Sequence, residues 1–182
     1  MNKFRLKKED TVLIVIDLQE KLLAAMPDRA KVCANTRLLL TLAKKFNLPV
    51  ILTEQYPQGL GSTLPEVSEL LPEHQRLEKT RFSAFCPEML EILRKTGRHT
   101  IIMAGSETHV CVYQTTRDLL EQGFNVHIAS DAVCSRFKEN YENALSLMQS
   151  MGAVISNTET MLFDFMVESG HPHFRSISAL LK

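Results

Sequence analysis

Five continuous apolar runs limit what this chain of 182 residues can fold into. They are TVLIVID (11–17), PVILTE (49–54), HTIIMAG (99–105), FNVHIASD (124–131) and the weaker AVIS (153–156). Unbroken apolar runs of this length are typical of strands that are covered on both faces. HQRLEKTRF (74–82) is predicted to add a short strand, although Leu77 gives it little apolar signal. The sequence therefore predicts a buried sheet.

Helical patterns separate these runs, at about 28–46, 87–95, 109–122 and 139–151, and two more short helices are predicted between about 159 and 181. Gly97, Gly123 and Gly152 each follow a helical pattern and precede a strand, as helix C-cap glycines do. Alternating strands and helices predict right-handed βαβ crossovers. The predicted class is therefore α/β, with a parallel sheet covered by helices on both sides.

The composition fits one globular domain spanning residues 1–182. An apolar fraction of 45% supplies a core without a disulfide framework. The 21 basic and 21 acidic residues cancel, so no overall field attracts nucleic acid or an anionic membrane. The first apolar run is too short for a membrane span, and the four cysteines lack metal-ligand spacing. We therefore expect a cytoplasmic protein with reduced thiols that binds neither nucleic acid nor membrane.

Ligands of an open parallel sheet gather in the crevice beyond the carboxyl ends of its strands. The residues at these ends are Asp17, Glu54, Gln55, Lys79 and the segments 105–111 and 131–134. No G-x-G-x-x-G sequence follows the first run and no Walker A sequence occurs. A reaction that needs no nucleotide cofactor is therefore expected at this edge of the sheet.

Cys111 lies between a predicted strand and a predicted helix, where free backbone N–H groups favour a thiolate. The alternative is a small buried residue that only packs. His109 is a candidate base, but residues two apart on a helix point to different faces. Cys86 is a rival nucleophile, because a helix beginning at the next residue would give it the same environment. Cys134 is interpreted as structural.

Asp17 ends the most apolar run, and a buried carboxylate there must be capped, paired with a cation, or used in chemistry. Gln19 either bonds to the local turn or contacts substrate. Lys79 would by itself be interpreted as part of a solvated charged face. Beside an aspartate and a cysteine, however, its ammonium favours their deprotonated forms, while the carboxylate relays the thiol proton.

Three stretches together resemble the isochorismatase-like cysteine hydrolases: IVIDLQ (14–19), EKTRFSAF (78–85) and GSETHVCVYQTTRDLLEQGFNVHIASDA (105–132). The resemblance extends from about residue 10 to 170. It implies a three-layer α/β/α sandwich with a six-stranded parallel sheet in the order 3-2-1-4-5-6. It also implies a catalytic triad, with Asp17 as proton acceptor, Lys79 as charge stabiliser and Cys111 as nucleophile.

The resemblance further implies a cis peptide between Ser106 and Glu107, with the backbone N–H groups of Glu107 and Cys111 as the oxyanion hole. Nicotinamidases of this superfamily carry an Asp-x-His metal motif after the second strand. Here that place reads TEQYPQGLGS, without histidine. We therefore expect no catalytic metal and no cofactor. The cysteine favours cleavage of a C–N bond through a thioester over hydrolysis of a vinyl ether.

The predicted activity is hydrolysis of a small amide in a crevice walled by Gln19, Tyr56, Phe85, Glu107 and Tyr113. The resemblance also implies a homo-oligomer, a dimer or larger. The alternatives are a redox sensor in which Cys134 resolves an oxidised Cys111, a non-catalytic oligomeric protein, and a vinyl-ether hydrolase. Nuclease activity is disfavoured by the neutral charge and by the lack of paired metal carboxylates.

Overall fold

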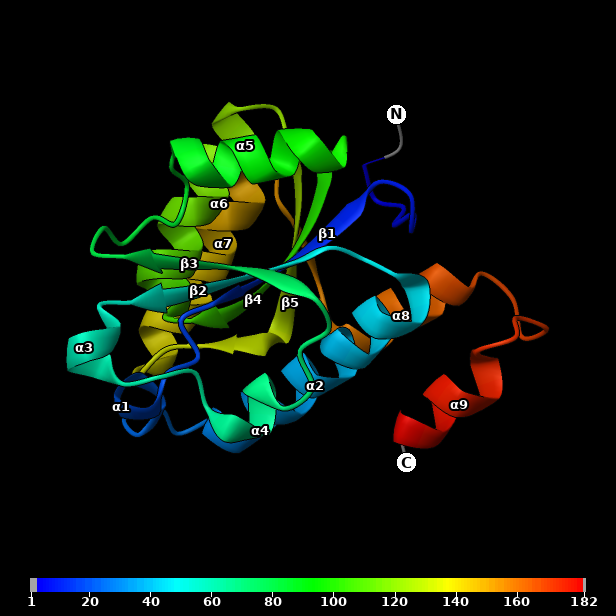
Figure 1. The fold of residues 1–182 in the computed structure, drawn as a ribbon, viewed down its shortest axis with the longest axis horizontal. Coiled ribbons are helices and arrows are strands. Elements are labelled where there is room, and N and C mark those ends of the chain that lie inside the picture. Colours follow the sequence, from blue (N-terminus) through cyan, green and yellow to red (C-terminus); the bar gives the residue numbers. More distant parts are fainter. Residues whose placement is uncertain (1–2, 182) are drawn as a thin grey trace.

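The computed structural model describes residues 3–181 and contains a six-stranded parallel sheet in the order β3-β2-β1-β4-β5-β6 (Figure 1). The strands are β1 (Thr11–Ile16), β2 (Val50–Gln55), β3 (His74–Lys79), β4 (Thr100–Ser106), β5 (Asn125–Cys134) and β6 (Val154–Ser156). Every pair of neighbours is parallel. The predicted fold class and strand order are confirmed.

Helices cover both faces of the sheet (Figure 1). One face is covered by α2 (Arg29–Phe46) and α8 (Thr158–Met166), and the other by α5 (Pro87–Thr96), α6 (Tyr113–Glu121) and α7 (Lys138–Ser150). The shorter α9 (Phe174–Ser178) and the 3-10 helix η2 (Ala179–Leu181) end the described chain. No helix in residues 3–181 is long and apolar enough to cross a membrane.

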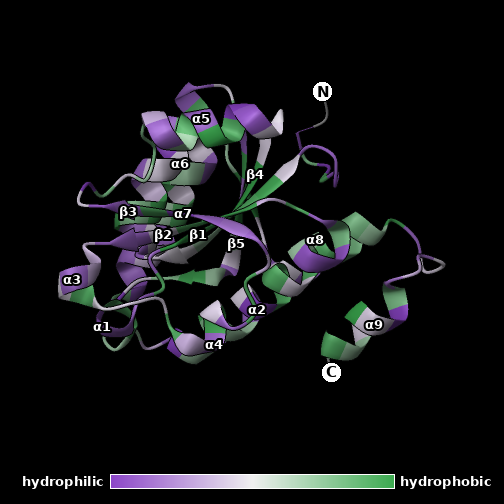
Figure 2. Ribbon diagram, viewed as in Figure 1, coloured by the Kyte–Doolittle hydropathy of each residue, from purple (hydrophilic) through white to green (hydrophobic). Residues whose placement is uncertain are grey.

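Each side of the sheet has its own hydrophobic core. Along β1, Leu13 and Val15 belong to one core, whereas Val12, Ile14 and Ile16 belong to the other. Successive side chains of a strand point to opposite faces, so a strand that feeds two cores must be apolar at every position. This explains the unbroken apolar runs, which colour the central strands as hydrophobic in Figure 2.

The weak apolar signal of β3 follows from its position at the edge of the sheet. Leu77 is its one buried residue, because an edge strand leaves the other positions partly open to solvent. At the other side of the sheet the prediction for β5 was too short, since the strand continues past Asp131 to Cys134 after an irregularity in its pairing with β4. Asp131 lies inside this longer strand, and its Oδ1 accepts from the Thr158 backbone N–H (2.8 Å) at the start of α8.

Three short helices were missed: α1 (Glu20–Leu23), α3 (Pro57–Leu60) and α4 (Pro65–Ser68). These three helices are held in place by tertiary contacts more than by the helix propensity of their own residues. Gln19 forms an antiparallel bridge with Thr63, whose hydroxyl donates to Glu54 Oε1 (2.6 Å). Four-residue helices carry too little periodicity to be recognised from sequence.

Gly105 brings β4 close to the end of β1. A Cβ at Gly105, where φ is +130°, would lie 2.1 Å from the backbone oxygen of Ile16, which cannot move aside. We expect Gly105→Ala to lower the free energy of unfolding in urea by about 3 kcal/mol or more. Gly123→Ala is the matched control, because φ is +83° there but nothing lies within 4 Å, and about 1–2 kcal/mol is expected. Equal losses would contradict this account of Gly105.

Candidate active site

The three residues of the predicted triad meet at the carboxyl edge of the sheet. Asp17 follows β1, Lys79 ends β3, and Cys111 lies in the π-helix η1 (Thr108–Val112) that follows β4. The Lys79 ammonium reaches past the end of β2 and lies 2.5 Å from Asp17 Oδ2. The Cys111 thiol interacts with the side chains of both. Three segments far apart in sequence thus supply one cluster.

Asp17 is completely buried and tightly held. Its φ of +48° lies in the left-handed region, which Asp and Asn tolerate better than most residues. The Thr53 hydroxyl donates to Oδ1 (2.6 Å), and the Ser106 hydroxyl donates to the Asp17 carbonyl (2.9 Å). One carboxylate oxygen is therefore fixed by Thr53, and the other faces Lys79.

Lys79 has 9% of its side chain exposed, and four oxygens surround its ammonium. Besides Asp17, these are Gln55 Oε1 (2.7 Å) and the backbone oxygens of Phe82 (3.1 Å) and Arg81 (3.3 Å). An ammonium has three donors, so this shell uses its capacity. The positive charge is fixed beside Asp17 and Cys111, and Lys79 does not belong to a solvated face.

Cys111 is 6% exposed and rests as a thiol. Burial raises its pKa to about 12, the Asp17 carboxylate acts in the same direction, and Lys79 opposes them. The start of a helix favours a thiolate, but here the removal of the sulfur from water outweighs that effect and the cationic neighbour. A reaction at this sulfur therefore needs a base, and Asp17 is the carboxylate that acts on its pKa.

The turn between β4 and the thiol has an unusual backbone. The Ser106–Glu107 peptide is cis, where the resemblance implied one. The Glu107 carbonyl accepts from the N–H groups of Val110 (3.1 Å) and Val112 (3.2 Å). Among the hydrogen bonds that turns, loops and caps make within residues 3–181, none has the Glu107 N–H as its donor. Its carboxylate is tied to Arg136, with Oε2 and Nε 3.1 Å apart.

His109 does not serve Cys111 as a base. Its Nδ1 lies 3.0 Å from the Ser135 hydroxyl, and its Nε2 is 3.5 Å from Asn140 Nδ2. The first is a hydrogen bond of ordinary length and the second is at the limit. The ring is directed toward the segment after β5, as its spacing from Cys111 predicted.

Gln19 fixes the backbone next to the site. Its amide is completely buried, donates to the carbonyls of Gln55 (3.0 Å) and Gly61 (2.7 Å), and accepts from the Gln55 N–H (2.7 Å). Gln19 therefore does not line an open crevice, and the alternative of a bond to the local turn is the correct one. It fixes the end of β2, from which Gln55 holds Lys79.

Three aromatic residues that were predicted to line the crevice lie near this edge. Tyr56 is 54% exposed, and its N–H donates to the Lys79 carbonyl (2.8 Å). Phe85 and Tyr113 are half-buried against the core that contains Cys111. The sequence reasoning missed Thr53 and Ser106. Thr53 lies inside an apolar run, and nothing in its neighbourhood signals a contact with Asp17.

The other thiols have different surroundings. Cys86 is the N-cap of α5, and its Sγ accepts from the Met89 N–H (3.5 Å). Cys134 is 1% exposed, and burial raises its pKa to about 12. Cys86 thus caps a helix, and Cys134 is a packed residue of β5. Among the described residues, no cluster of three His, Cys, Asp or Glu side chains could hold a metal ion.

The raised thiol pKa values predict that alkali weakens the fold. Each thiol has a folded pKa near 12, above the ordinary value near 9, so its stabilising effect is complete below pH 9 and is lost as pH rises toward 12. We expect the difference in unfolding free energy between wild type and Cys134→Ala to shrink above pH 9, by at most about 1.4 kcal/mol per pH unit. Urea unfolding from pH 7 to 10.5 measures this. A constant difference would contradict it.

Known proteins are similar to this chain over most of its length. The Isochorismatase domain family matches residues 11–160. A secreted isochorismatase effector of Phytophthora sojae (strain P6497) is 38% identical over 183 residues, covering 98% of this chain and 87% of that protein. The MAR1 ribonuclease structure from Caenorhabditis elegans is 37% identical, with a TM-score of 0.93 over 97% of this chain and 92% of its own.

A more distant structure has the same fold. The YcaC gene product of Escherichia coli, described as an octameric hydrolase of unknown specificity, is 28% identical to this chain. Its TM-score is 0.85, over 97% of this chain and 87% of its own. The family match includes Asp17, Lys79 and Cys111.

Proposed function

This chain belongs to the isochorismatase family, and from that premise we propose that it is a cysteine hydrolase that cleaves the C–N bond of a small amide. The observation that carries the proposal is a buried ion pair of Lys79 and Asp17 at the carboxyl edge of the sheet, with the Cys111 thiol near enough for both to affect its pKa. A thiol whose pKa is raised, held beside a carboxylate and an ammonium at such an edge, is a candidate for chemistry.

The first step is removal of the thiol proton. Asp17 Oδ2 accepts the proton of Cys111, and the Lys79 ammonium stabilises the thiolate that forms. Thr53 donates to Oδ1 and Lys79 to Oδ2, and the carboxylate keeps further lone pairs that can take the thiol proton. At rest Cys111 stays a thiol, because burial disfavours the thiolate. Proton transfer is therefore coupled to the presence of an acyl carbon that takes the sulfur electrons.

The thiolate then attacks the amide carbonyl, forming an S–C bond while the C=O electron pair moves to oxygen. The backbone N–H groups of Glu107 and Cys111 are proposed to hold this oxyanion, and such donors contribute roughly 3 to 4 kcal/mol. The unpartnered Glu107 N–H supports this assignment. Asp17 returns its proton to the nitrogen as the C–N bond breaks. Water, deprotonated by the same carboxylate, cleaves the thioester, and the sulfur regains its proton.

We propose Tyr56, Phe85 and Tyr113 as walls for the substrate, with Glu107 at the turn. Lys79 and Arg136 are already engaged by oxygen acceptors, which favours an uncharged amide over an anionic one. The proposed chemistry needs no metal, since Lys79 already places a cation beside the reacting groups. Gln55 ends β2, within the stretch that stands in place of the metal motif of nicotinamidases, and its side chain accepts from that ammonium.

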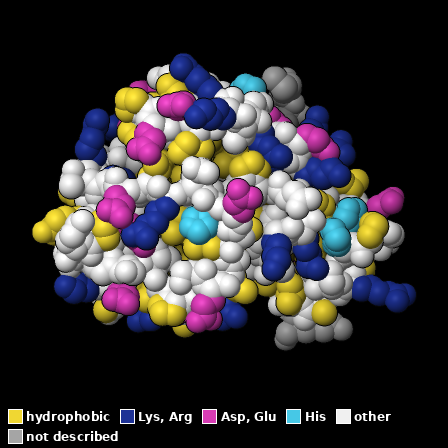
Figure 3. All heavy atoms as spheres, in the orientation of Figure 1, with side chains coloured by type: hydrophobic (Ala, Val, Ile, Leu, Met, Phe, Trp, Pro, Cys, Tyr) yellow, Lys and Arg dark blue, Asp and Glu magenta, His cyan; other side chains and the backbone are white. Residues whose placement is uncertain are grey.

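Other activities have less support. Ribonuclease activity is suggested by the name of the C. elegans relative, but this chain has a net charge of zero, and basic and acidic side chains are interspersed over the face drawn in Figure 3. A redox pair of Cys111 and Cys134 is disfavoured because burial keeps both as thiols. Hydrolysis of a vinyl ether would leave the nucleophilic thiol without a role.

We propose that the protein is a homo-oligomer, as the octameric relative supports. The exposed Phe82 and Phe137 side chains are apolar surface that a second subunit could cover. Light scattering should therefore give a whole-number multiple, two or more, of the 20.6 kDa chain mass. A mass of one chain at micromolar concentration would contradict this proposal.

The test of function is a panel of small amides, other nitrogen-linked carbonyls, vinyl ethers and a short RNA, assayed with wild-type protein. Release of amine or ammonia from at least one uncharged amide is expected, with no cleavage of the RNA. Hydrolysis confined to vinyl ethers or RNA would overturn the assignment to C–N bonds. Chelator treatment of the active protein should leave the rate unchanged.

Thr53 is proposed as a positioning residue for Asp17. Thr53→Val removes the hydroxyl while keeping the shape, so we expect kcat to fall about 10- to 100-fold with KM little changed, as for a lost hydrogen bond to a charged group. Thr53→Ser should restore most of kcat. The matched control is Thr36→Val, because Thr36 is also buried and its hydroxyl has no partner. Equal effects at the two positions would remove the role assigned to Thr53.

A further inference from the structure

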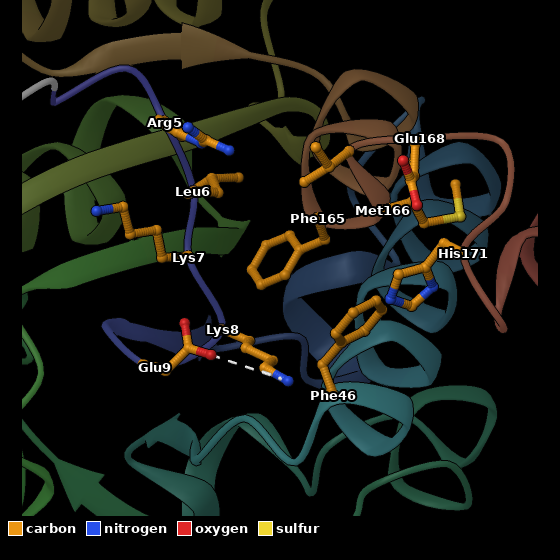
Figure 4. A pocket seen from close by; sticks show the side chains of 11 residues that line it. Arg5, Leu6, Lys7, Lys8, Glu9, Phe46, Phe165, Met166, Glu168 and His171 are labelled. Carbon is orange, nitrogen blue, oxygen red and sulfur yellow. Dashed lines mark ion pairs between the residues drawn. The ribbon is translucent and has the colours of Figure 1, made fainter.

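A hollow lies beside the segment that leads into β1, and Figure 4 shows the side chains that line it. It has a volume of about 520 Å³ and is bounded by the segment 5–9 before β1, the end of α2, and the chain from Phe165 to His171. Asp17 follows β1, whose six residues span roughly 20 Å at about 3.3 Å each. The hollow is therefore separate from the proposed active site, and its size is typical of small-ligand pockets.

The floor of this hollow is aromatic and buried. The ring of Phe46 lies 5.4 Å from that of Phe165 and is stacked with the ring of His171 at 5.3 Å. Phe46 and Phe165 are 8% and 6% exposed, and buried Leu6 lies beside Phe165 (Figure 4). Flat apolar side chains that remain in contact with an open hollow favour a ligand with a flat apolar body.

One wall carries a cation that has no anionic partner. The Arg5 guanidinium points across the mouth of the hollow, whereas the Lys7 ammonium points away from it (Figure 4). In residues 3–181 the Arg5 side chain makes no ion pair or hydrogen bond, while the Lys8 ammonium lies 3.8 Å from Glu9. A guanidinium presents a fork of donors that matches a carboxylate. The Glu168 carboxylate on the facing wall disfavours ligands that carry several negative charges.

The two walls are fixed before any ligand binds. The Leu6 N–H donates to Asp164 Oδ2 (2.7 Å), and His127 Nε2 lies 2.8 Å from the Lys3 carbonyl, which ties segment 3–9 to the body. Across the hollow, Val167 has φ +65°, and the Glu168 N–H closes a tight turn to the Met166 carbonyl (2.7 Å). Positive φ at a β-branched residue is strained and is found at ligand sites.

We propose that this hollow is a binding site for a small organic monocarboxylate with an aryl body. The carboxylate pairs with Arg5, and the aryl group lies against Phe165 and Phe46. No bond is made or broken there. Because the walls are ordered, the protein loses little conformational entropy when a ligand binds. A small molecule can therefore bind there without first having to order the walls.

The test uses the full-length protein and three probes of one shape: 3-phenylpropionate, 3-phenylpropan-1-ol and 3-phenylpropylamine. Titration followed by amide NMR should show the acid binding about tenfold more tightly than the alcohol or the amine. The shifted amides should lie in segments 5–9 and 165–171. Arg5→Gln should weaken the acid about tenfold, and the matched charge change Lys7→Gln should leave its affinity unchanged.

Equal affinity for the three probes in wild-type protein would overturn the proposal, whatever the variants do. Shifts gathered around Cys111 would overturn it as well, because they would assign binding to the other edge. If Lys7→Gln weakens the acid as much as Arg5→Gln, general attraction by a basic segment explains the result and the site is refuted. An Arg5→Gln protein that fails to fold leaves the probe comparison in wild type as the deciding result.

Discussion

Cys111→Ala is expected to reduce turnover of any amide substrate about 10⁴-fold or more, to near the uncatalysed rate, because the substitution removes the only nucleophile in the proposed mechanism. The fold should survive, since the side chain loses a single atom and stability changes of about 1 kcal/mol are usual for small truncations. Rates of amine release by the two proteins, with circular dichroism as the check on folding, measure both effects.

Cys86→Ala is the matched control for that experiment. Cys86 caps α5 through the Met89 N–H, so its loss should cost about 1 kcal/mol of stability and leave kcat unchanged. Cys86 was the rival nucleophile in the sequence, and the pair of variants separates the two assignments. Turnover kept in Cys111→Ala, or lost in Cys86→Ala, would contradict the triad.

Asp17→Asn is expected to lower kcat about 10²- to 10⁴-fold, the range usual for a removed general base, with a much smaller change in KM. Asn tolerates the left-handed backbone at this position and still accepts from Thr53, so geometry is kept while the base is lost. The Lys79 ammonium is then left buried without its carboxylate. A loss of about 3 kcal/mol in unfolding free energy is therefore expected as well.

A second substitution separates this stability loss from the loss of chemistry. Asp17→Asn combined with Lys79→Met removes the unpaired charge, so much of the lost stability should return while activity stays absent. Denaturant unfolding and substrate turnover are measured on the same preparations. If the double variant regains activity together with stability, Asp17 acts only through the fold and is not the base.

The sheet could be predicted because its central strands feed two cores. Val12 to Ile16 are buried on alternating faces, so every residue of β1 after Thr11 is apolar and the run is unmistakable. β3 was harder, since Leu77 alone is buried at the sheet edge. The four-residue helices around Thr63 depend on contacts to Glu54 and Gln19 from distant segments, and no local pattern records such contacts.

The site was predictable where chemistry coincides with position. Asp17, Lys79 and Cys111 are polar residues at strand ends, and a parallel sheet brings those ends to one edge. The supporting contacts were not predictable. Thr53 lies within a strand. Gln19 is the same residue type whether its amide lines a pocket or bonds to the backbone, so the sequence cannot distinguish the two roles. The raised pKa of Cys111 could not be predicted either, because burial depends on packing that the start of a helix does not reveal.

The central claim is that Cys111 carries the acyl group during turnover. The most direct measurement is rapid acid quench of wild-type protein with a substrate from the amide panel, followed by intact-mass and peptide mass spectrometry. A mass increase of one acyl group on the peptide containing Cys111, absent from Cys111→Ala, is the predicted result. Steady turnover with the acyl group on Cys86, or with no adduct on any thiol at quench times shorter than one turnover, would contradict it.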